Sequence, residues 1–401
     1  MSSGPWTNRG WRRRLTVGVL AGALLAGATA STASAHGGPL GPFYVPQPNA
    51  GAITQLKALA AAGQWKDAAL LAKMITTPTA VWFTKGTPAE VKASVRATVN
   101  AAARKHAVPV LVAYDAPARD CSQYSAGGAA SDADYKAWID GFAAGIGSAA
   151  AVVVVEPDGL SLLPSDCGQE PADQSGPITQ GRFGNIAYAA KKLGALHGTK
   201  VYLDAGHSHW QSVATMTDRL IKGGVSDADG FSVNTSNYQT TKGLQQYGSW
   251  ISKCIAYVQK QSGSSANCAS QYYPATASDE STWALTDAWY AANVTAKPTA
   301  HFVIDTSRNG KGPWTPPADH PTGDPQDWCN PPDRGNGPRP TWATGNPLND
   351  AFLWIKVPGE SDGQCYRWTT GPNDPVRNMA DPAAGQWFPE AALELARNAT
   401  K

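Results

Sequence analysis

Short runs of apolar residues recur along the chain, and stretches with helical spacing separate them. The apolar runs predict strands at residues 80–83, 108–114, 152–155, 200–203, 230–233, 301–304 and 351–355. The intervening periodicity predicts helices at 52–62, 88–106, 132–146 and 183–193, one ending near residue 222, and a last one at 389–396. Strands that alternate with helices in this way indicate a parallel sheet.

The four valines at residues 152–155 form the clearest of these strands. They are β-branched and apolar, which is typical of a strand buried on both faces, and Pro157 ends the pairing because it has no N–H to donate. Glu156 and Asp158 follow directly. The motif alone supports two interpretations of Asp158 equally: a general acid whose pKa is raised by desolvation, or a cap on the next turn.

Polar side chains follow six successive strands. The loops carry, in chain order, Asp115 and Asp120, Glu156 and Asp158, Asp204 and His207, Asn234 and Asn237, Asp305 and Arg308, and Glu360 and Asp362. Barrels of alternating strands and helices hold their active sites at this end, whereas a doubly wound sheet binds its ligand at one switch point. No Gly-x-Gly-x-x-Gly motif follows the first strand and no Walker loop occurs, which argues against a nucleotide site. We therefore expect an α/β fold, a closed or nearly closed β/α barrel in a single domain.

Asp204, His207 and His209 invite a metal-site interpretation, because Asp and His are common ligands. Their Ala-Gly spacer follows a strand and offers no helical i, i+4 pair, which makes this the weaker interpretation. Neither a metal nor an organic cofactor is expected. Asp305 and Arg308 are interpreted as a structural ion pair at a strand end, without a catalytic role.

The composition favours a neutral polar ligand. Lys and Arg number 33 against 31 Asp and Glu, so the net charge is +2 and no nucleic-acid surface is expected. Only 16% of the residues are charged, whereas 15 tryptophans and 13 tyrosines are available to stack on the C–H faces of sugars.

Residues 1–35 are predicted to be an export signal. Arg12, Arg13 and Arg14 precede a small apolar stretch at 15–28, and Ala33-Ser34-Ala35 fits a cleavage site. General and twin-arginine export are both compatible with this pattern. Residues 36–50 are expected to form an extended lead-in to one domain at 51–401. No later apolar run is long enough to span a membrane, so we expect a secreted protein without a membrane anchor.

Six cysteines in an exported chain favour disulfides over metal sites, and no Cys-x-x-Cys spacing occurs. Several connectivities are possible, and sequential pairing is suggested by the order Cys121, Cys167, Cys254, Cys268, Cys329, Cys365. Residues 309–349 are rich in Pro, Gly and Trp and have little periodicity. Because long irregular segments are often functional, Trp314, Trp328 and Trp342 are expected to lie in a segment ordered over the site.

Six motifs occur in one order along the chain: Tyr114-Asp-Ala-Pro-Ala-Arg119-Asp120-Cys121, Val155-Glu-Pro-Asp158, Leu203-Asp-Ala-Gly-His207, Asn234-Thr-Ser-Asn237, Asp327-Trp-Cys-Asn330, and Trp354-Ile-Lys356 through Gly359-Glu-Ser-Asp362-Gly. Together they resemble the family 6 glycoside hydrolases, secreted β-1,4-glucanases that comprise endoglucanases and cellobiohydrolases. The resemblance covers about residues 42–396. It implies a distorted, incompletely closed β/α barrel, and makes 51–401 the catalytic domain.

The resemblance also implies inverting hydrolysis, in which two carboxyl groups lie about 6.5–9.5 Å apart to admit a water. It makes Asp158 the general acid, Asp120 the carboxylate that keeps this acid protonated and helps relay the water's proton, and Asp362 the candidate base. Supporting groups near the cleaved bond are Tyr114, Arg119 and Asp204, and Arg119 is expected to hold a carboxylate bidentately. The positions that match sugar contacts are His207, Trp210, Asn237, Trp328, Lys356 and Glu360, with Trp210 and Trp328 as stacking platforms on opposite sides of the scission point.

Two positions depart from the family pattern. Ala126 stands where several members have a serine proposed to carry a chain of water, and Gly159 replaces a commonly larger residue, which is expected to open the site. The short segments bounded by Cys121 and Cys167 and by Cys329 and Cys365 resemble open-cleft endoglucanases rather than tunnel enzymes. A bridge between Cys254 and Cys268 is outside the family's usual two.

The leading hypothesis is a secreted, monomeric, inverting endo-β-1,4-glucanase whose partner is a β-glucan polysaccharide or oligosaccharide. A cellobiohydrolase of the same family is the first alternative. The second is a non-catalytic glucan-binding protein, which the departures at Ala126 and Gly159 motivate.

Overall fold

The computed structural model describes residues 40–317 and 326–400. Within them, seven strands form one sheet whose order in space follows the order in the chain, and every neighbouring pair is parallel. The strands are β1 (Val81–Phe83), β2 (Val110–Ala113), β3 (Ala151–Val155), β4 (Thr199–Asp204), β5 (Gly230–Val233), β6 (His301–Asp305) and β7 (Asn349–Leu353). Each predicted strand is confirmed to within three residues at either end.

The two edges of the sheet approach each other without pairing as strands. The N–H of Ala80 donates to the carbonyl of Trp354 at 2.9 Å, and Trp82 Nε1 donates to the carbonyl of Ile355 at 2.8 Å. In the described part of the chain no ladder joins β1 to β7. The expected β/α barrel is therefore present in an incompletely closed form.

Successive side chains of the strands alternate between two buried layers, as strand geometry requires. One layer fills the inside of the barrel and includes Val110, Val112, Tyr114, Val152, Val154, Tyr202, Val303, Ala351 and Leu353. The other layer packs under helices and includes Leu111, Val153, Val155, Val201, Leu203, Phe231, Phe302 and Ile304, with Ile139, Ile186 and Ile251 from the helices. Burial on both faces explains why the strands are continuous apolar runs.

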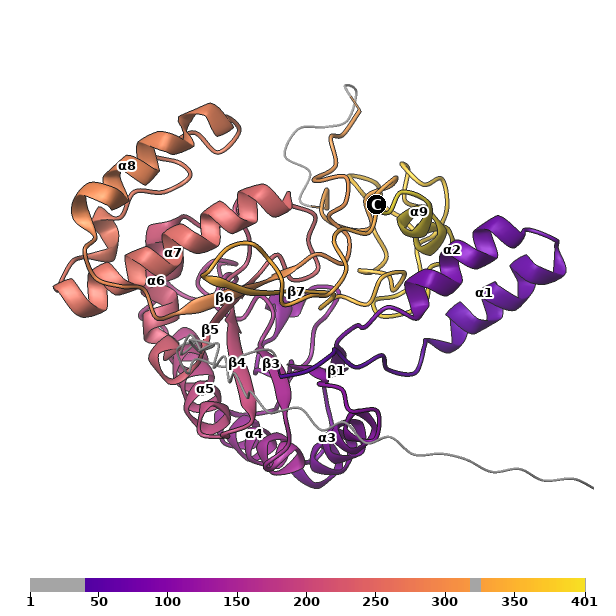
Figure 1. The fold of residues 1–401 in the computed structure, drawn as a ribbon, viewed down its shortest axis with the longest axis horizontal. Helices are drawn as coiled ribbons and strands as arrows, with labels where there is room; N and C mark the ends of the chain where they lie inside the picture. The colour runs from indigo at the N-terminus through magenta and orange to yellow at the C-terminus, as the bar shows by residue number, and fades with distance from the viewer. Residues whose placement is uncertain (1–39, 318–325, 401) are drawn as a thin grey trace, which may run out of the picture. The chain divides into compact units, whose positions relative to one another are not determined.

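The helices are α1 (Ala50–Ala61), α2 (Trp65–Ile75), α3 (Pro88–Ala103), α4 (Asp132–Ile146), α5 (Pro177–Gly194), α6 (Val213–Lys222), α7 (Thr241–Gln261), α8 (Trp283–Asn293) and α9 (Pro389–Arg397). Single 3₁₀ turns are η1 (Asp120–Ser122), η2 (Val225–Asp227), η3 (Ser265–Asn267) and η4 (Glu280–Thr282). Around the sheet, α3 to α7 cover its outer side, while α1 and α2 pack with α9 (Figure 1).

Three of these helices, α2, α7 and α8, were not among the sequence predictions. In addition, α5 begins at Pro177 and not near residue 183, because proline is well suited to the first helical position, where its missing N–H would have no partner. The remaining predicted helices are confirmed with small shifts at their ends.

The predicted export signal, residues 1–35, and the first residues of the lead-in lie outside the described residues. From residue 40 the lead-in runs without helix to Asn49, whose side chain caps α1, and Phe43 pairs with Val108 in a single parallel bridge. Trp342 stacks on Phe43, with ring centroids 4.5 Å apart. Phe43 pairs just before the start of β2, at the end of the sheet opposite the loops of the site, so the prediction that Trp342 lies over the site is wrong.

Three disulfides join the cysteines in sequence order, which confirms the suggested pairing. Cys121–Cys167 and Cys329–Cys365 close segments of 46 and 36 residues, and Cys254–Cys268 closes one of 14. Among the described residues, no helix has the length and apolar character needed to cross a membrane.

Candidate active site

Asp158 lies in the turn that follows β3, with its backbone in the left-handed region at φ 64°. Its main-chain N–H donates to Asp204 Oδ1 at 3.0 Å. Burial raises the pKa of Asp158 well above its ordinary value, and the negative charges of Asp204, Asp120 and Asp362 raise it further. The carboxyl group therefore keeps its proton to a higher pH than an ordinary aspartate.

Asp204, at the end of β4, is buried and acts as an acceptor for four protein groups. Besides the Asp158 N–H, it accepts hydrogen bonds from the N–H of Gly206 at 3.1 Å and from the hydroxyls of Ser232 at 3.1 Å and Thr235 at 2.6 Å. Burial raises the pKa of Asp204 to about 6, although these hydrogen bonds oppose the shift. Asp204 thus fixes the backbone on which Asp158 is carried.

Glu156 directly follows β3, as the sequence pattern predicts, and it has a structural role. It is 1% exposed and accepts hydrogen bonds from the N–H groups of Asp115 at 3.0 Å and Ala116 at 3.1 Å. These bonds join the end of β3 to the loop after β2. That loop carries Asp120, so Glu156 sets the spacing between the strand ends of Asp120 and Asp158.

Asp120 lies on the loop after β2, also in the left-handed region at φ 56°. Its Oδ2 accepts the N–H of Ser125 at 2.7 Å. Burial raises the pKa of Asp120, while the Ser125 hydrogen bond and the charge of Arg119 act against this shift. Left-handed conformations are costly for residues other than glycine, and their occurrence at Asp120, Asp158 and Asn330 concentrates backbone strain at this edge of the sheet.

Arg119 does not hold a carboxylate bidentately, so that prediction is wrong. Its guanidinium group donates to the carbonyls of Ser125 at 2.8 Å and Thr84 at 3.1 Å, and also to those of Tyr114 and Ala126. It stacks on the ring of Tyr114, with Cζ 4.4 Å from the centroid. A planar group with several donors can bind many carbonyls at once, and here it shapes the loop that carries Asp120.

The two departures from the family pattern have different outcomes. A Cβ atom on Gly159 would lie 2.8 Å from both Cβ and the carbonyl oxygen of Glu156 and 3.1 Å from Ile186. The prediction that Gly159 opens the site is therefore wrong, because a side chain there would meet the buried Glu156, which directly follows β3, and Ile186 of α5. Ala126 contributes its carbonyl to Arg119, and the main-chain N–H of Ser125 is the group that contacts Asp120.

Asp362, on the loop after β7, is held by positive charge. Arg308 Nη1 donates to its two oxygens at 2.9 and 2.8 Å, and Lys356 Nζ lies 3.2 Å from Oδ1. The side chains of Arg308 and Asp362 are each 4% exposed. Burial by itself would raise the pKa of Asp362, but the charges of Arg308 and Lys356 lower it to about 2. Asp362 is thus an ionised carboxylate at any ordinary pH.

This pairing corrects the prediction for Arg308. Arg308 pairs with Asp362, and Asp305 instead accepts four main-chain N–H groups, those of Ser236, Ser307, Ile355 and Lys356, at 2.9–3.2 Å. Asp305 therefore connects the ends of β5, β6 and β7 and has no ion-pair partner among the interactions of the described residues.

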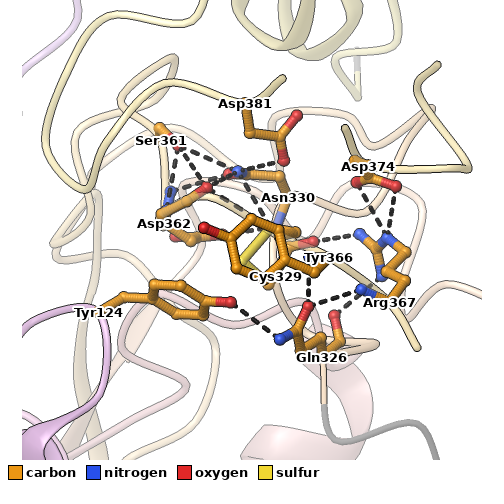
Figure 2. The surroundings of a disulfide bond; sticks show 12 residues. Tyr124, Gln326, Cys329, Asn330, Ser361, Asp362, Tyr366, Arg367, Asp374 and Asp381 are labelled. Atoms are coloured by element: carbon orange, nitrogen blue, oxygen red, sulfur yellow. Dashed lines mark hydrogen bonds and ion pairs between the residues drawn. A yellow bond between two sulfur atoms is a disulfide. The ribbon is translucent and has the colours of Figure 1, made fainter. Parts of the chain in front are cut away.

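Asn330 lies between Asp362 and the Cys329–Cys365 disulfide (Figure 2). Its side-chain nitrogen contacts Ser361 Oγ at 3.0 Å, the carbonyl of Gly363 at 2.8 Å and Asp381 Oδ2 at 2.9 Å. Its main-chain N–H donates to Asp362 Oδ2 at 3.0 Å. The disulfide and the candidate base thus share one buried network of hydrogen bonds.

The same network reaches the loop that carries Asp120. Gln326 Nε2 donates to the hydroxyl of Tyr124 at 2.8 Å, and Gln326 Oε1 accepts the N–H of Arg367 at 2.7 Å (Figure 2). The buried Arg367 guanidinium group binds Asp374 at 3.0 Å through Nε. The loops after β2 and β7 are therefore tied together beside the site.

The residues predicted to contact sugar lie on the same set of loops. The rings of His207 and Trp210 are tilted against each other at 5.6 Å, and Trp328 is 37% exposed, with its ring 6.2 Å from that of Tyr124. Burial lowers the pKa of His207 to about 3, so this imidazole is neutral. Glu360 accepts a hydrogen bond from Asn49 Nδ2 at 3.0 Å, and burial raises its pKa.

Two of the predicted contact residues are also bound to protein groups. Lys356 Nζ donates to the carbonyl of Ser361 at 3.1 Å in addition to its contact with Asp362. Asn237 Oδ1 accepts the N–H of Tyr238 at 2.8 Å. These contacts fix both side chains at the edge of the sheet where the candidate carboxylates lie.

In the described part of the chain, the potential metal ligands that approach one another are Cys365, Asp374 and Asp381. Cys365 is consumed by its disulfide, and Asp374 is bound by Arg367. Asp204, His207 and His209 form no such group, and both oxygens of Asp204 are already bonded to protein donors.

Sequence reasoning missed the partners of the candidate carboxylates. Arg308, Tyr238 and Asn330 all contact Asp362, and Tyr238 does so through its hydroxyl at 3.3 Å. A local signal existed for two of them, since Arg308 follows a strand end and Asn330 closes one of the six motifs. Nothing in the sequence indicated that they meet at one carboxylate.

Comparisons with known proteins agree with this arrangement. The family model described as Glycosyl hydrolases family 6 matches residues 41–399. Endoglucanase A of Cellulomonas fimi is 36% identical over 334 residues, which are 83% of this chain and 57% of that protein. Endoglucanase A of Thermobispora bispora is 34% identical over 394 residues, 96% of this chain and 70% of that protein. The chain thus spans little more than half of the first relative's length.

A solved structure extends the similarity to three dimensions. The endoglucanase Cel6 from Mycobacterium tuberculosis, in complex with methyl-cellobiosyl-4-deoxy-4-thio-β-D-cellobioside, superimposes with a TM-score of 0.67 at 36% sequence identity. The match covers 89% of this chain and 97% of that one. With the family model matched over nearly all of residues 40–400, the chain belongs to the family 6 glycosyl hydrolases.

Proposed function

We propose that this chain is a secreted, inverting endo-β-1,4-glucanase that hydrolyses cellulose or a related β-glucan. The observation that carries the proposal is the opposite displacement of the pKa values of two carboxyl groups, one on the loop after β3 and one on the loop after β7, close enough for the charge of Asp362 to act on Asp158. The pKa of Asp158 is raised well above its ordinary value, whereas that of Asp362 is lowered to about 2. Two carboxyl groups whose environments separate their pKa values are suited to act as an acid and a base.

Asp158 is the proposed general acid. At neutral pH its carboxyl group retains the proton that the leaving glycosidic oxygen must receive. The charges of Asp120 and Asp204 disfavour its ionised form, so their removal would lower its pKa. Asp204 has a second task, because its hydrogen bond to the Asp158 N–H fixes the turn from which the acid projects.

The water that attacks the sugar must lose a proton to a second carboxylate. Asp362 is ionised before the reaction starts, which a base requires, but Arg308 and Lys356 reduce its affinity for a proton. The pKa of Asp120 is raised, which makes it the stronger proton acceptor of the two when ionised. Following the family pattern, we assign Asp362, which is already ionised, as the base, and Asp120, the stronger acceptor, as the carboxylate that relays the proton.

Tyr114 and Arg119 are proposed as supporting groups near the cleaved bond, and the proposed sugar contacts are His207, Trp210, Asn237, Trp328, Lys356 and Glu360. Trp210 and Trp328 supply aromatic faces, and sugars present C–H faces that pack against such rings. The neutral imidazole of His207 can donate or accept a hydrogen bond without placing a charge beside the ligand. The bound compound in the mycobacterial structure is a cello-oligosaccharide analogue, which supports a β-1,4-glucan as the ligand.

Endo attack is favoured over a cellobiohydrolase by the short disulfide-bounded segments of 46 and 36 residues. The two relatives described above are named endoglucanases, which also supports endo attack. The binding-protein alternative loses one of its two supports, because Gly159 packs against Glu156 and Ile186. Export, monomeric state and independence of metal remain part of the proposal.

The experiment is a comparison of carboxymethylcellulose, mixed-linkage glucan and xylan as substrates, with viscosity, reducing ends and the released anomer measured together. We expect a rapid loss of viscosity per reducing end on the two glucans and the anomer of inverted configuration. Slow viscosity loss would support the cellobiohydrolase. An absence of reducing ends between pH 4 and 9 would support the binding protein.

A further inference from the structure

Two exposed tyrosines lie on the loop between α7 and α8, beside the proposed sugar platform. Tyr272 is 45% exposed and Tyr273 is 80% exposed. The hydroxyl of Tyr272 lies 3.5 Å from the carbonyl oxygen of Trp210, so this ring stands next to Trp210 on the side of the loop after β4. Large aromatic side chains gain free energy from burial, and one that is left half exposed beside a ligand platform has a face available for ligand.

The loop is held rigidly against the loop after β4. Gln271, which is 3% exposed, donates through Nε2 to the carbonyl of Ser208 at 3.0 Å and to that of Gln211 at 2.9 Å. The Cys254–Cys268 disulfide joins the start of the loop to α7. The stretch of backbone that leads into Tyr272 is therefore fixed against the loop after β4 and against α7.

Further hydrogen bonds attach the loop to α8. Thr286 Oγ1 donates to the carbonyl of Ser270 at 2.8 Å, and the hydroxyl of Tyr290 donates to that of Ala269 at 2.8 Å. The N–H of Tyr272 donates to Ser270 Oγ at 3.1 Å. Binding to a ring that is already placed costs little conformational entropy, which is the advantage of a preformed site.

We propose that Tyr272 is an additional stacking platform, which extends the glucan-binding surface beyond Trp210 for longer chains. The ligand is the β-glucan of the proposed function, and the contact that Tyr272 offers it is an aromatic face next to Trp210. This inference rests on the proposed function. Among the described residues, Tyr273 makes no hydrogen bond to the loop after β4, and the platform does not include it.

The test measures kcat/KM of the full chain on cello-oligosaccharides from the trimer to the hexamer and on soluble β-glucan. Tyr272→Ala should lower kcat/KM about three- to tenfold on the longer substrates, through KM, and leave the shortest hydrolysed substrate unchanged. Tyr272→Phe keeps the ring and should retain wild-type values. Tyr273→Ala, one residue further on the same loop, is the matched control and should match the wild type throughout.

Each outcome decides the proposal. Equal values for Tyr272→Ala and the wild type at every chain length, in an active enzyme, would overturn the platform and leave the proposed function intact. An equal loss of kcat/KM in Tyr272→Ala at every chain length would show a general effect of the loop and would overturn the platform. The same loss of kcat/KM in Tyr273→Ala would also overturn it. A wild-type protein that hydrolyses no glucan would overturn the proposed function together with this inference.

Discussion

Asn330 and Asp362 exchange two hydrogen bonds in opposite directions. The main-chain N–H of Asn330 donates to Asp362 Oδ2 at 3.0 Å, and the main-chain N–H of Asp362 donates to Asn330 Oδ1 at 2.8 Å. Asn330 follows Cys329 directly, so the disulfide to Cys365 anchors one end of this exchange. The candidate base is therefore positioned by a residue 32 positions away in the sequence.

Asn330→Ala should lower kcat much more than it changes KM. The substitution removes the acceptor for the Asp362 N–H and leaves the buried Asp381 without its donor, a loss of about 1–3 kcal/mol of stability. Because Asn330 has φ 41°, the difference between Asn330→Gly and Asn330→Ala, which both lack the side-chain amide, isolates the contribution of backbone strain. Steady-state kinetics and thermal unfolding measure both effects.

The matched control for that variant is Asn185→Ala. Asn185 is 1% exposed and its amide donates to Asp132 Oδ1 at 2.7 Å on the helical layer. A comparable loss of stability is expected there, without a change in kcat or in the pH profile. If both variants reduced kcat in proportion to stability, Asn330 would have only a structural role.

Asp158→Asn should stabilise the protein near neutral pH. The folded-state pKa of Asp158 is raised, so the folded protein holds this proton more tightly than the unfolded chain does, and wild-type stability falls as pH rises above the ordinary value of 3.8. The asparagine variant has no carboxyl group to ionise at this position, so it does not lose stability in this way as pH rises. Its Tm should equal that of the wild type below pH 3 and exceed it at pH 7, and a lower Tm at pH 7 would contradict the raised pKa.

Asp362→Asn should instead destabilise the protein near neutral pH. The pKa of Asp362 is lowered from 3.8 to about 2, so its ionised form contributes stability that is present above pH 3.8 and lost as pH falls through about 2, roughly 2 kcal/mol in all. The variant also leaves the buried Arg308 without its partner, a loss of about 3–5 kcal/mol. Denaturant unfolding at pH 7 and pH 2 measures the difference, which should shrink at the lower pH.

The acidic limb of the pH profile of kcat/KM separates the two candidate bases. Activity requires an ionised base, so the limb should fall near pH 2 if Asp362 accepts the proton. Asp120 has a raised pKa and would place the limb above the ordinary aspartate value of 3.8. The alkaline limb reports the loss of the Asp158 proton and should lie well above the ordinary aspartate pKa of 3.8. Rates measured within the range of reversible folding provide both limbs.

The sequence predicted the sheet well because a strand that is buried on both faces is a continuous run of apolar residues, as at Val152 to Val155 in β3. It did not predict α7, although Leu244, Tyr247, Trp250, Ile251, Cys254 and Ile255 are buried at helical spacing along it. Several glycines, serines and glutamines between these positions dilute the apolar pattern. The helical spacing of apolar residues was therefore present in α7, but the small and polar residues between them made it hard to recognise.

Local sequence patterns could not predict the partners of Asp362. Arg308, Asn330 and Lys356 lie on three separate stretches of the chain and meet only once the barrel has formed. The interpretation of Arg308 as the partner of Asp305 followed proximity in sequence. In the fold, Asp305 is surrounded by main-chain donors, and the guanidinium group reaches the last strand's loop instead.

The most direct test of the central claim is the rate of reducing-end release from carboxymethylcellulose by Asp158→Ala relative to the wild type. General acid catalysis contributes roughly 10²–10⁴-fold, so the variant should lose activity by that factor while its fold, followed by circular dichroism, stays intact. A folded Asp158→Ala protein that retained activity within a few-fold of the wild type would contradict the assignment of Asp158 as the proton donor.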